Sequence, residues 1–506
     1  MIEQHGSLAE KFLKKGFWLY LFSFIIAPLG YIIKIIVSNE LSVSEVGILY
    51  GIISLIILVS SYNDLWMSES LKYFIPKYLA KKDYSKIKTI VSLALIIQIF
   101  TALIISCLFY FGSNFLATHY FKNPLSAEAL KVFAFFFVGF NILQTLSNFF
   151  MAVQDTFYSR LSEFIRMFWA MWLVLFLLFT DLASLKNFSI IQVIWVYLWC
   201  LFAIGSFYKL YFNKYLRWAS LNLSYREIQP IISYALLVII WTSAATILSQ
   251  IDMQMIIYIL GTTDAWYYTN YLSIIGIPFM IIGPIFALLF PVIAELHGTW
   301  DFSKIASIKK VFSDIFISVG LMFNIFFFVF AEVIAFTLFW EKFINSGTIL
   351  QYAILFLVFN FLLQINFNLQ AGIGNIKSNV KITVAAMFFN IITNIILIKL
   401  IWVYWAALAT WIGWLFMLIL SHFSINKKYR SPIGVDNIFK NMCIFTLWGA
   451  FFYYISWYMN LFESRLTSFR ILWLFFTVWS WIFVITNYSM FKNFISEIKR
   501  LKWKKI

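Results

Sequence analysis

The chain has 506 residues, of which 62% are hydrophobic and only 12% are charged. A soluble globular protein carries about 25% charged residues, so this composition excludes an ordinary soluble domain. The net charge of +16 is compatible with nucleic-acid binding, but the basic residues gather in short loops between long apolar segments. That distribution is typical of a protein that crosses a membrane many times, and we expect no nucleic-acid partner.

Apolar segments long enough to cross a bilayer, roughly 20 residues in a helix, recur along the whole chain. No cleavable signal peptide is evident, because the N-terminus carries acidic residues and the first apolar run is long enough to stay in the membrane. We therefore predict an all-α integral membrane protein with about fourteen spans, near residues 15–38, 45–68, 88–112, 129–152, 159–180, 188–211, 230–258, 265–293, 309–339, 348–370, 378–400, 403–422, 438–459 and 468–489.

The basic residues assign the two sides of the membrane. Lysines crowd the loop after the second predicted span, and the C-terminal tail is also basic. Because cytoplasmic loops carry the excess of Lys and Arg, both termini are expected in the cytoplasm. Anionic lipid headgroups are the expected partners of these loops. The lysines of the first loop are Lys72, Lys77, Lys81, Lys82, Lys86 and Lys88.

The second predicted span opens with two glycines four residues apart, Gly47 and Gly51. Small residues at this spacing let another helix approach closely in a membrane. We interpret the pair as a packing surface rather than a direct contact with a substrate.

The chain contains an internal repeat. Residues 45–87 end in Asp-Tyr-Ser-Lys-Ile, and about 218 positions later the same order returns as Asp-Phe-Ser-Lys-Ile at residues 301–305. A proline precedes each ending, Pro76 in the first copy and Pro291 in the second. We read the repeat as a gene duplication that gives two parallel six-helix lobes, at residues 1–225 and 226–425. Residues 426–506 then form two additional helices and a basic tail.

The repeat also includes amide side chains on helices downstream of these loops. One predicted helix carries Asn141, Gln144 and Asn148, and its equivalent in the second half carries Asn360, Gln364 and Asn368. Asn390 and Asn394 form a further pair on the next helix. Amides facing lipid are costly, so these side chains are expected to face protein or a wet cavity. Hydrogen bonding between helices and a cavity wall that contacts sugar are the two alternatives.

The stretches LSVSEVGILYGIISLI, NDL and YFIPKYLAKKDYSKIKTIVSLAL, together with LSQIDMQMIIYILG in the second half, resemble a known family. They are similar to the polysaccharide-biosynthesis flippases, which move O-antigen and capsule repeat units and belong to the multidrug/oligosaccharidyl-lipid/polysaccharide exporter superfamily. The resemblance implies two six-helix lobes around a cavity that opens alternately to either side. It also implies an undecaprenyl-diphosphate-linked oligosaccharide as substrate and a polysaccharide polymerase as a working partner. The implied location is the bacterial cytoplasmic membrane.

Two basic residues lie well inside predicted spans, where ionisable groups are expensive and are candidates for function. Lys34 lies about a turn from the outer end of the first span, so it either reaches the interface or offsets a phosphate charge. Arg166 follows Glu163 by three residues, so a local ion pair is the structural alternative to a role in the cavity.

Asp252 occupies the position in the second half that Lys34 occupies in the first. The two side chains are predicted to meet across the cavity and close its outer side. Alternatively, Asp252 responds to a proton or sodium ion, or lies close enough to water to need no partner.

The leading interpretation is a flippase for a lipid-linked oligosaccharide, with no cofactor and with an unidentified coupling ion. A drug or organic-cation antiporter of the same superfamily is the nearest alternative. An integral-membrane glycosyltransferase or polymerase is less favoured, because the predicted outer loops are short and carry few acidic residues. The cysteines and histidines show no spacing typical of a metal site.

Overall fold

The computed structural model describes residues 25–26, 28–63, 65, 67–153, 155–298, 302–354, 357–401, 403–429, 437–459 and 464–493. Every regular element within these ranges is a helix, so the predicted all-α class is confirmed. Eight helices in the described ranges are long and apolar enough to cross a membrane, or up to 10 if each of two bent pairs forms one span. The count of fourteen spans stays a prediction.

Backbone contacts divide the chain into two compact units, Met1–Trp266 and Tyr267–Ile506. The first unit holds the helical residues 28–40 and then α2 (Val43–Asn63), α3 (Met67–Ala80), α4 (Tyr84–Phe111), α5 (Ser113–Phe115), η1 (Leu116–Tyr120), α6 (Ser126–Ala134), α7 (Phe136–Ala152), α8 (Thr156–Phe179), α9 (Leu185–Phe207), η2 (Tyr208–Leu216) and α10 (Tyr225–Ile259). The lobe boundary that the repeat predicts, between residues 225 and 226, stays a prediction. The repeat compares sequence between the two halves, whereas the two units are grouped by contacts between their backbones.

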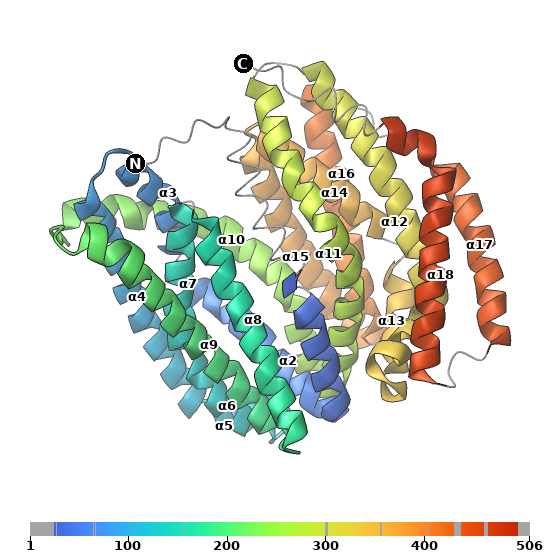
Figure 1. Ribbon diagram of the computed structural model, residues 1–506, viewed down its shortest axis with the longest axis horizontal. Helices are drawn as coiled ribbons and strands as arrows, with labels where there is room; N and C mark the ends of the chain where they lie inside the picture. Colours follow the sequence, from blue (N-terminus) through green and yellow to red (C-terminus); the bar gives the residue numbers. More distant parts are fainter. Residues whose placement is uncertain are drawn as a thin grey trace. The chain divides into compact units, whose positions relative to one another are not determined.

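The second unit begins within α11 (Thr262–Gly298). It continues through α12 (Phe302–Phe339), η3 (Glu341–Phe343), α13 (Ile344–Ile354), α14 (Leu357–Gly372), α15 (Ile376–Ile401), α16 (Tyr404–Tyr429), α17 (Ile438–Tyr458) and α18 (Arg465–Thr486). Within this unit α17 and α18 pack on α12 (Figure 1).

The two halves share the order of their helices. α4 begins at Tyr84 and α12 begins at Phe302, the equivalent position of the repeat. A bent pair of helices follows in each half, with 44° between α6 and α7 and 57° between α13 and α14. Asp83 explains the start of α4, since its carboxylate accepts a hydrogen bond from the Lys86 backbone N–H at 3.0 Å and so caps the helix. Its counterpart, Asp301, lies outside the described residues.

The predicted span at 45–68 is not one continuous helix. α2 ends at Asn63, and α3 begins at Met67. Between them Leu65 has a φ of 41°, in the left-handed region that a residue with a side chain rarely adopts. The chain therefore bends sharply inside the first unit.

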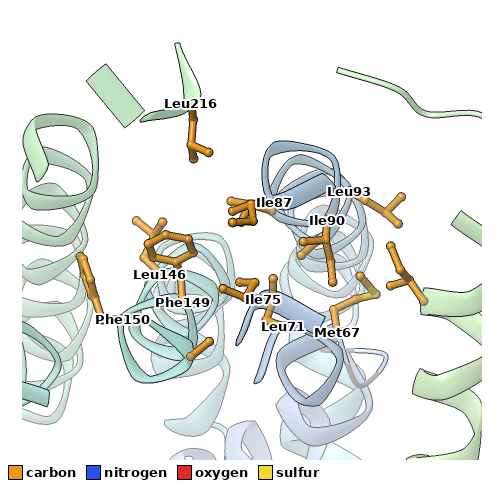
Figure 2. Packing of buried hydrophobic residues seen from close by; sticks show 14 of the residues in the cluster. Met67, Leu71, Ile75, Ile87, Ile90, Leu93, Leu146, Phe149, Phe150 and Leu216 are labelled. Carbon is orange, nitrogen blue, oxygen red and sulfur yellow. The ribbon is translucent and has the colours of Figure 1, made fainter. Parts of the chain in front are cut away.

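Beyond that bend, α3 is held by an apolar cluster (Figure 2). Met67, Leu71 and Ile75 recur every four residues, so they lie on one face of α3. That face packs against side chains from α4 and α7, whereas Lys72 and Lys77 on the opposite face are exposed. The facing residues are Ile87, Ile90, Leu93, Leu146, Phe149 and Phe150.

The two C-terminal helices are joined to α12 by polar contacts as well as by aromatic packing. Asn441 Nδ2 donates to Ser318 Oγ at 2.7 Å, and Trp479 Nε1 donates to the Met322 carbonyl at 3.2 Å. Arg465 donates to the carbonyls of Thr337 and Leu338, which lie in the last turn of α12. A cation at a helix C-terminus stabilises the negative end of the helix dipole. Arg465, the first residue of α18, therefore caps the C-terminal end of α12.

α2 approaches the end of α10 and the start of α11 very closely at the two glycines. A Cβ atom on Gly47 would lie 1.8 Å from the Thr262 carbonyl oxygen, and one on Gly51 would lie 2.5 Å from Ile257 Cδ1. These distances confirm the interpretation of the glycine pair as a packing surface. Gly261, with a φ of 109°, lets the chain leave α10 and start α11 within a few residues.

We expect Gly47→Ala to destabilise the protein by about 1–3 kcal/mol, because the added methyl group must push the Thr262 carbonyl away. Gly205→Ala is the matched control, since a Cβ there meets nothing within 4 Å. Thermal unfolding in detergent measures both effects. Equal melting temperatures for the two variants would contradict the close contact between α2 and the start of α11.

Candidate functional site

Arg166 on α8 lies against two indole rings of α9. Its guanidinium carbon is 4.8 Å from the centroid of Trp195 and 5.2 Å from that of Trp199. The ion pair with Glu163, the structural alternative to a role in the cavity, is present at 3.8 Å, with 17% of the arginine side chain exposed. Cation–π contacts hold a guanidinium in a fixed orientation without neutralising it. Arg166 is therefore a positioned positive charge within the first unit.

Lys34 lies in the helical residues 28–40 and points toward α2. Its ammonium nitrogen is 4.7 Å from the ring centroid of Tyr50, and the side chain is half-buried. Asp252 is buried on α10, with 4% of its surface exposed. The predicted pairing of Lys34 with Asp252 stays a prediction, as do the alternatives for each residue.

The amides of the first half connect helices. Asn141 Nδ2 donates to the Gln98 carbonyl of α4 at 2.9 Å, and Asn148 Nδ2 donates to Ser68 Oγ of α3 at 2.7 Å. Gln144 lies between them on α7 and is half-buried. Hydrogen bonding between helices, one of the two alternatives, is therefore observed for Asn141 and Asn148. A contact with sugar stays a prediction.

The equivalent amides of the second half bond differently. Asn368 Nδ2 donates to the Gln364 carbonyl of its own helix at 2.8 Å, and Asn394 Nδ2 donates to Asn390 Oδ1, also on the same helix, at 3.1 Å. Asn360 is buried, and its Oδ1 accepts no hydrogen bond from any residue in the described ranges.

Two amides that the sequence analysis did not single out connect α14 to α16. Asn366 Nδ2 donates to Ser421 Oγ at 3.0 Å, and Gln370 Nε2 donates to the Ser421 carbonyl at 3.2 Å. Their spacing of four residues places both on one face of α14. That spacing was the signal available in the sequence.

A buried polar network, which the sequence analysis also missed, joins α2 to α10. Gln254 Nε2 donates to Ser54 Oγ at 2.8 Å, and Ser54 Oγ donates to Gln250 Oε1 at 2.8 Å. The Tyr120 hydroxyl donates to Gln254 Oε1 at 2.8 Å. Burial raises the pKa of the Tyr120 phenol, so this group remains a donor at neutral pH.

The residues that follow Tyr120 bind the adjoining ends of α2, α10 and α11. Lys122 Nζ donates to the Tyr258 carbonyl in the last turn of α10 at 2.7 Å. Asn123 Nδ2 donates to Ser44 Oγ at 2.8 Å, and Ser44 Oγ lies 3.0 Å from Thr262 Oγ1. Residues 120–123, here termed the latch segment, thus hold the start of α2 against the end of α10.

The side chains described at these positions can bind a ligand through hydrogen bonds and charge, and none of them forms a recognisable catalytic group. Amide and hydroxyl groups exchange hydrogen bonds with sugars, and fixed cations attract phosphates. In the part of the chain that the structure describes, no group of three or more His, Cys, Asp or Glu residues is placed to hold a metal ion. Cys107, Cys200 and Cys443 are free thiols.

Residues 12–297 match the model of a family described as polysaccharide biosynthesis protein. The chain belongs to this family. The polysaccharide biosynthesis protein is also similar to an uncharacterized membrane protein of Methanocaldococcus jannaschii, with 25% identity over 452 residues that cover 84% of this chain and 87% of that protein.

Solved structures share the fold of this polysaccharide biosynthesis protein. The lipid II flippase MurJ in an inward closed conformation matches with a TM-score of 0.63 and 15% identity, over 92% of this chain and 99% of MurJ. An inward-facing multidrug resistance MATE transporter of the MOP superfamily matches with a TM-score of 0.66 and 14% identity, over 81% of this chain and 98% of that transporter. The chain thus shares its fold with both of these solved structures.

We expect the hydrogen bond between Tyr120 and Gln254 to couple the two residues by about 0.5–1.5 kcal/mol, because a buried donor and acceptor satisfy each other. The measurement is a double-mutant cycle with Tyr120→Phe and Gln254→Met, read as the free energy of unfolding in mixed micelles. Tyr197→Phe removes a different hydroxyl, one that donates to the Phe135 carbonyl at 2.9 Å, and should be additive with Gln254→Met. Additivity in both cycles would show that the Tyr120 bond contributes nothing.

Proposed function

We propose that this member of the polysaccharide biosynthesis protein family is a flippase for a lipid-linked oligosaccharide, an undecaprenyl-diphosphate-linked repeat unit of O-antigen or capsule. The family match over residues 12–297 carries the proposal. It is supported by a fold shared with MurJ, a lipid II flippase, over 92% of the chain. Alternating access between the two lobes would move the sugar across the bacterial cytoplasmic membrane, with both termini on the cytoplasmic side and a polysaccharide polymerase consuming the product.

The positioned charges suit the diphosphate of such a substrate. A phosphate in a low-dielectric site needs cations fixed in place, and an arginine held between indole rings loses little conformational entropy when it binds. Arg166 meets that requirement, and Lys34 adds a second positive charge in the first unit. The amides of α7, α14 and α15 are the proposed sugar contacts, because hydroxyl groups pair with both the donor and the acceptor of an amide.

A drug or organic-cation antiporter is the second candidate. The shared fold with a multidrug resistance transporter and the buried carboxyl group of Asp252 favour it. An acidic side chain inside a transporter attracts a cationic substrate or a coupling ion, either a proton or sodium. The two candidates differ in substrate charge, so they are separated by measuring which substrate moves.

In the proposed topology the latch segment and the ends of α2 and α10 lie on the outer side. Their contacts would hold that side closed. Because Thr262 and α10 belong to the second lobe of the repeat, release of substrate outside requires this contact to part. A conformational change of this kind exchanges the packing of rigid helices at a lobe interface.

Reconstituted vesicles with a fluorescent undecaprenyl-diphosphate oligosaccharide should show protein-dependent translocation to the opposite leaflet. We expect Arg166→Ala and Lys34→Ala each to slow it about tenfold, the effect of losing a charge-assisted contact of roughly 1.5–3 kcal/mol. Lys186→Ala is the matched control, since its exposed ammonium group pairs only at 3.5 Å with Glu128. Uptake of an organic cation driven by an ion gradient, without lipid translocation, would instead assign the protein to the antiporters and make Asp252 the residue to replace.

Ser44→Cys combined with Thr262→Cys should stop translocation under oxidising conditions and restore it with reductant. The two hydroxyl oxygens lie 3.0 Å apart, so sulfur atoms in their place are within reach of a disulfide. The background replaces Cys107, Cys200 and Cys443 by alanine, and each single-cysteine variant is a control. Unchanged translocation with the bond formed would show that α2 and α11 never part there.

A further inference from the structure

The last residue of α2, before the break between α2 and α3, has a buried amide side chain that makes no hydrogen bond to the described residues. Asn63, the last residue of α2, is 3% exposed. Both Nδ2 and Oδ1 of its side chain are buried and have no hydrogen-bond partner among the residues that the structure describes. A buried polar group left unsatisfied costs about 1–3 kcal/mol, so such a side chain requires an explanation.

Other unsatisfied oxygens lie on the helices that pack around this break. Thr101 Oγ1 of α4 donates to the Asn63 carbonyl at 3.0 Å and also lies 3.2 Å from the Gln98 carbonyl. That carbonyl accepts from Asn141 Nδ2 of α7 at 2.9 Å. This chain of contacts joins the end of α2, the middle of α4 and the start of the amide series on α7.

The unsatisfied side-chain oxygens on these helices can accept hydrogen bonds or bind a cation. Asn141 Oδ1, Gln144 Oε1 and Ser60 Oγ are buried and receive no hydrogen bond within the described ranges. Ser60 precedes Asn63 by three residues and Gln144 follows Asn141 by three, so each pair shares one face of its helix. Ser60 and Asn63 thus lie on one face at the end of α2, and Asn141 and Gln144 lie on one face of α7.

The electrostatic potential at the C-terminal end of α2 favours a positive charge. α2 ends at the break, and a helix C-terminus carries a partial negative charge. Amide, hydroxyl and carbonyl oxygens at the end of a broken helix are the ligands that membrane transporters use for alkali cations. Divalent ions are held mainly by carboxylates, so these neutral oxygens suit a monovalent ion.

The second half of the repeat keeps amides at the positions equivalent to Asn141 and Gln144, as Asn360 and Gln364, but has apolar residues where the first half has the polar residues of the break. At the positions 218 residues after Asn63, Gln98 and Thr101 stand Ile281, Phe316 and Val319. α11 runs unbroken from Thr262 to Gly298. Phe316 stacks there on Phe286 with 4.5 Å between ring centroids.

Because the second half packs with Ile281 at the position equivalent to Asn63, the amide of Asn63 is not needed for packing. We propose that the junction of α2, α4 and α7 binds a monovalent cation of sodium size, with Asn63 Oδ1, Asn141 Oδ1, Gln144 Oε1 and Ser60 Oγ as its side-chain ligands. The ion is coordinated by these otherwise unsatisfied oxygens and stabilises the break between α2 and α3. The site is separate from Asp252, and it assigns Asn141 and Gln144, two of the proposed sugar contacts, to the ion instead.

The test is the thermal unfolding of the full-length protein in detergent, titrated with sodium chloride against choline chloride at constant ionic strength. Sodium should raise the melting temperature with a saturating dependence on its concentration. Asn63→Leu and Asn141→Leu should lose more than half of that rise. Asn63→Asp should lower the half-maximal sodium concentration at least fivefold, because a carboxylate attracts the ion more strongly than an amide.

Asn441→Leu is the matched control, since it removes a buried amide in the second unit and should keep the full sodium effect. Ser60→Ala is the milder variant to use if Asn63→Leu does not fold, and it should also weaken the response. Equal melting temperatures of the wild type in both salts would overturn the proposal and leave ordered water as the occupant. A sodium effect retained by Asn63→Leu, Asn141→Leu and Ser60→Ala would also overturn it. Failed lipid translocation would leave the ion site unaffected, so the two proposals fail separately.

Discussion

The close contact between α2 and α10 constrains the rest of the first unit. Inside a bilayer, apolar side chains gain little by leaving lipid, so helices associate through tight packing and through polar groups that satisfy each other. Gly47 and Gly51 supply the tight packing, and Ser54, Gln250 and Gln254 supply the polar groups. A larger residue at either glycine would separate the helices and leave the amides buried without partners.

The sequence predicted features that depend on local spacing. The glycine pair involves residues within about a turn of each other, as does the ion pair of Arg166 with Glu163 that was one of two alternatives, and the structure contains both. The helical class followed from composition. The break after Asn63 was not predicted, because no proline or glycine marks it and the predicted span extends to residue 68.

Contacts between distant residues could not be read in this way. Gln254 accepts its hydrogen bond from a tyrosine 134 positions earlier, and nothing in a single sequence identifies that donor. The two tryptophans beside Arg166 are similarly remote in the chain. A single sequence shows which groups need partners, whereas the fold determines which partners they have.

The amide series shows how the two halves of a repeat acquire different contacts. Asn148 bonds to Ser68, but the residue 218 positions after Ser68 is Phe286, which offers no hydrogen-bonding group. Asn368 therefore bonds to the backbone of its own helix. A match between repeats predicts where a polar residue lies along its helix, but its role depends on what the neighbouring helix presents.

The packing of α10 has a consequence for how the protein can be divided. Although the sequence repeat places α10 in the second half, α10 belongs to the first unit by its contacts. Glu227 near its start pairs with Lys86 of α4 at 3.3 Å, and the Tyr258 carbonyl near its end accepts a hydrogen bond from Lys122. Two fragments expressed separately from a gene cut near residue 225 would leave α2 without its neighbour in the first fragment. A cut after Trp266 keeps α10 with α2, so complementation between fragments should succeed at the second position and fail at the first.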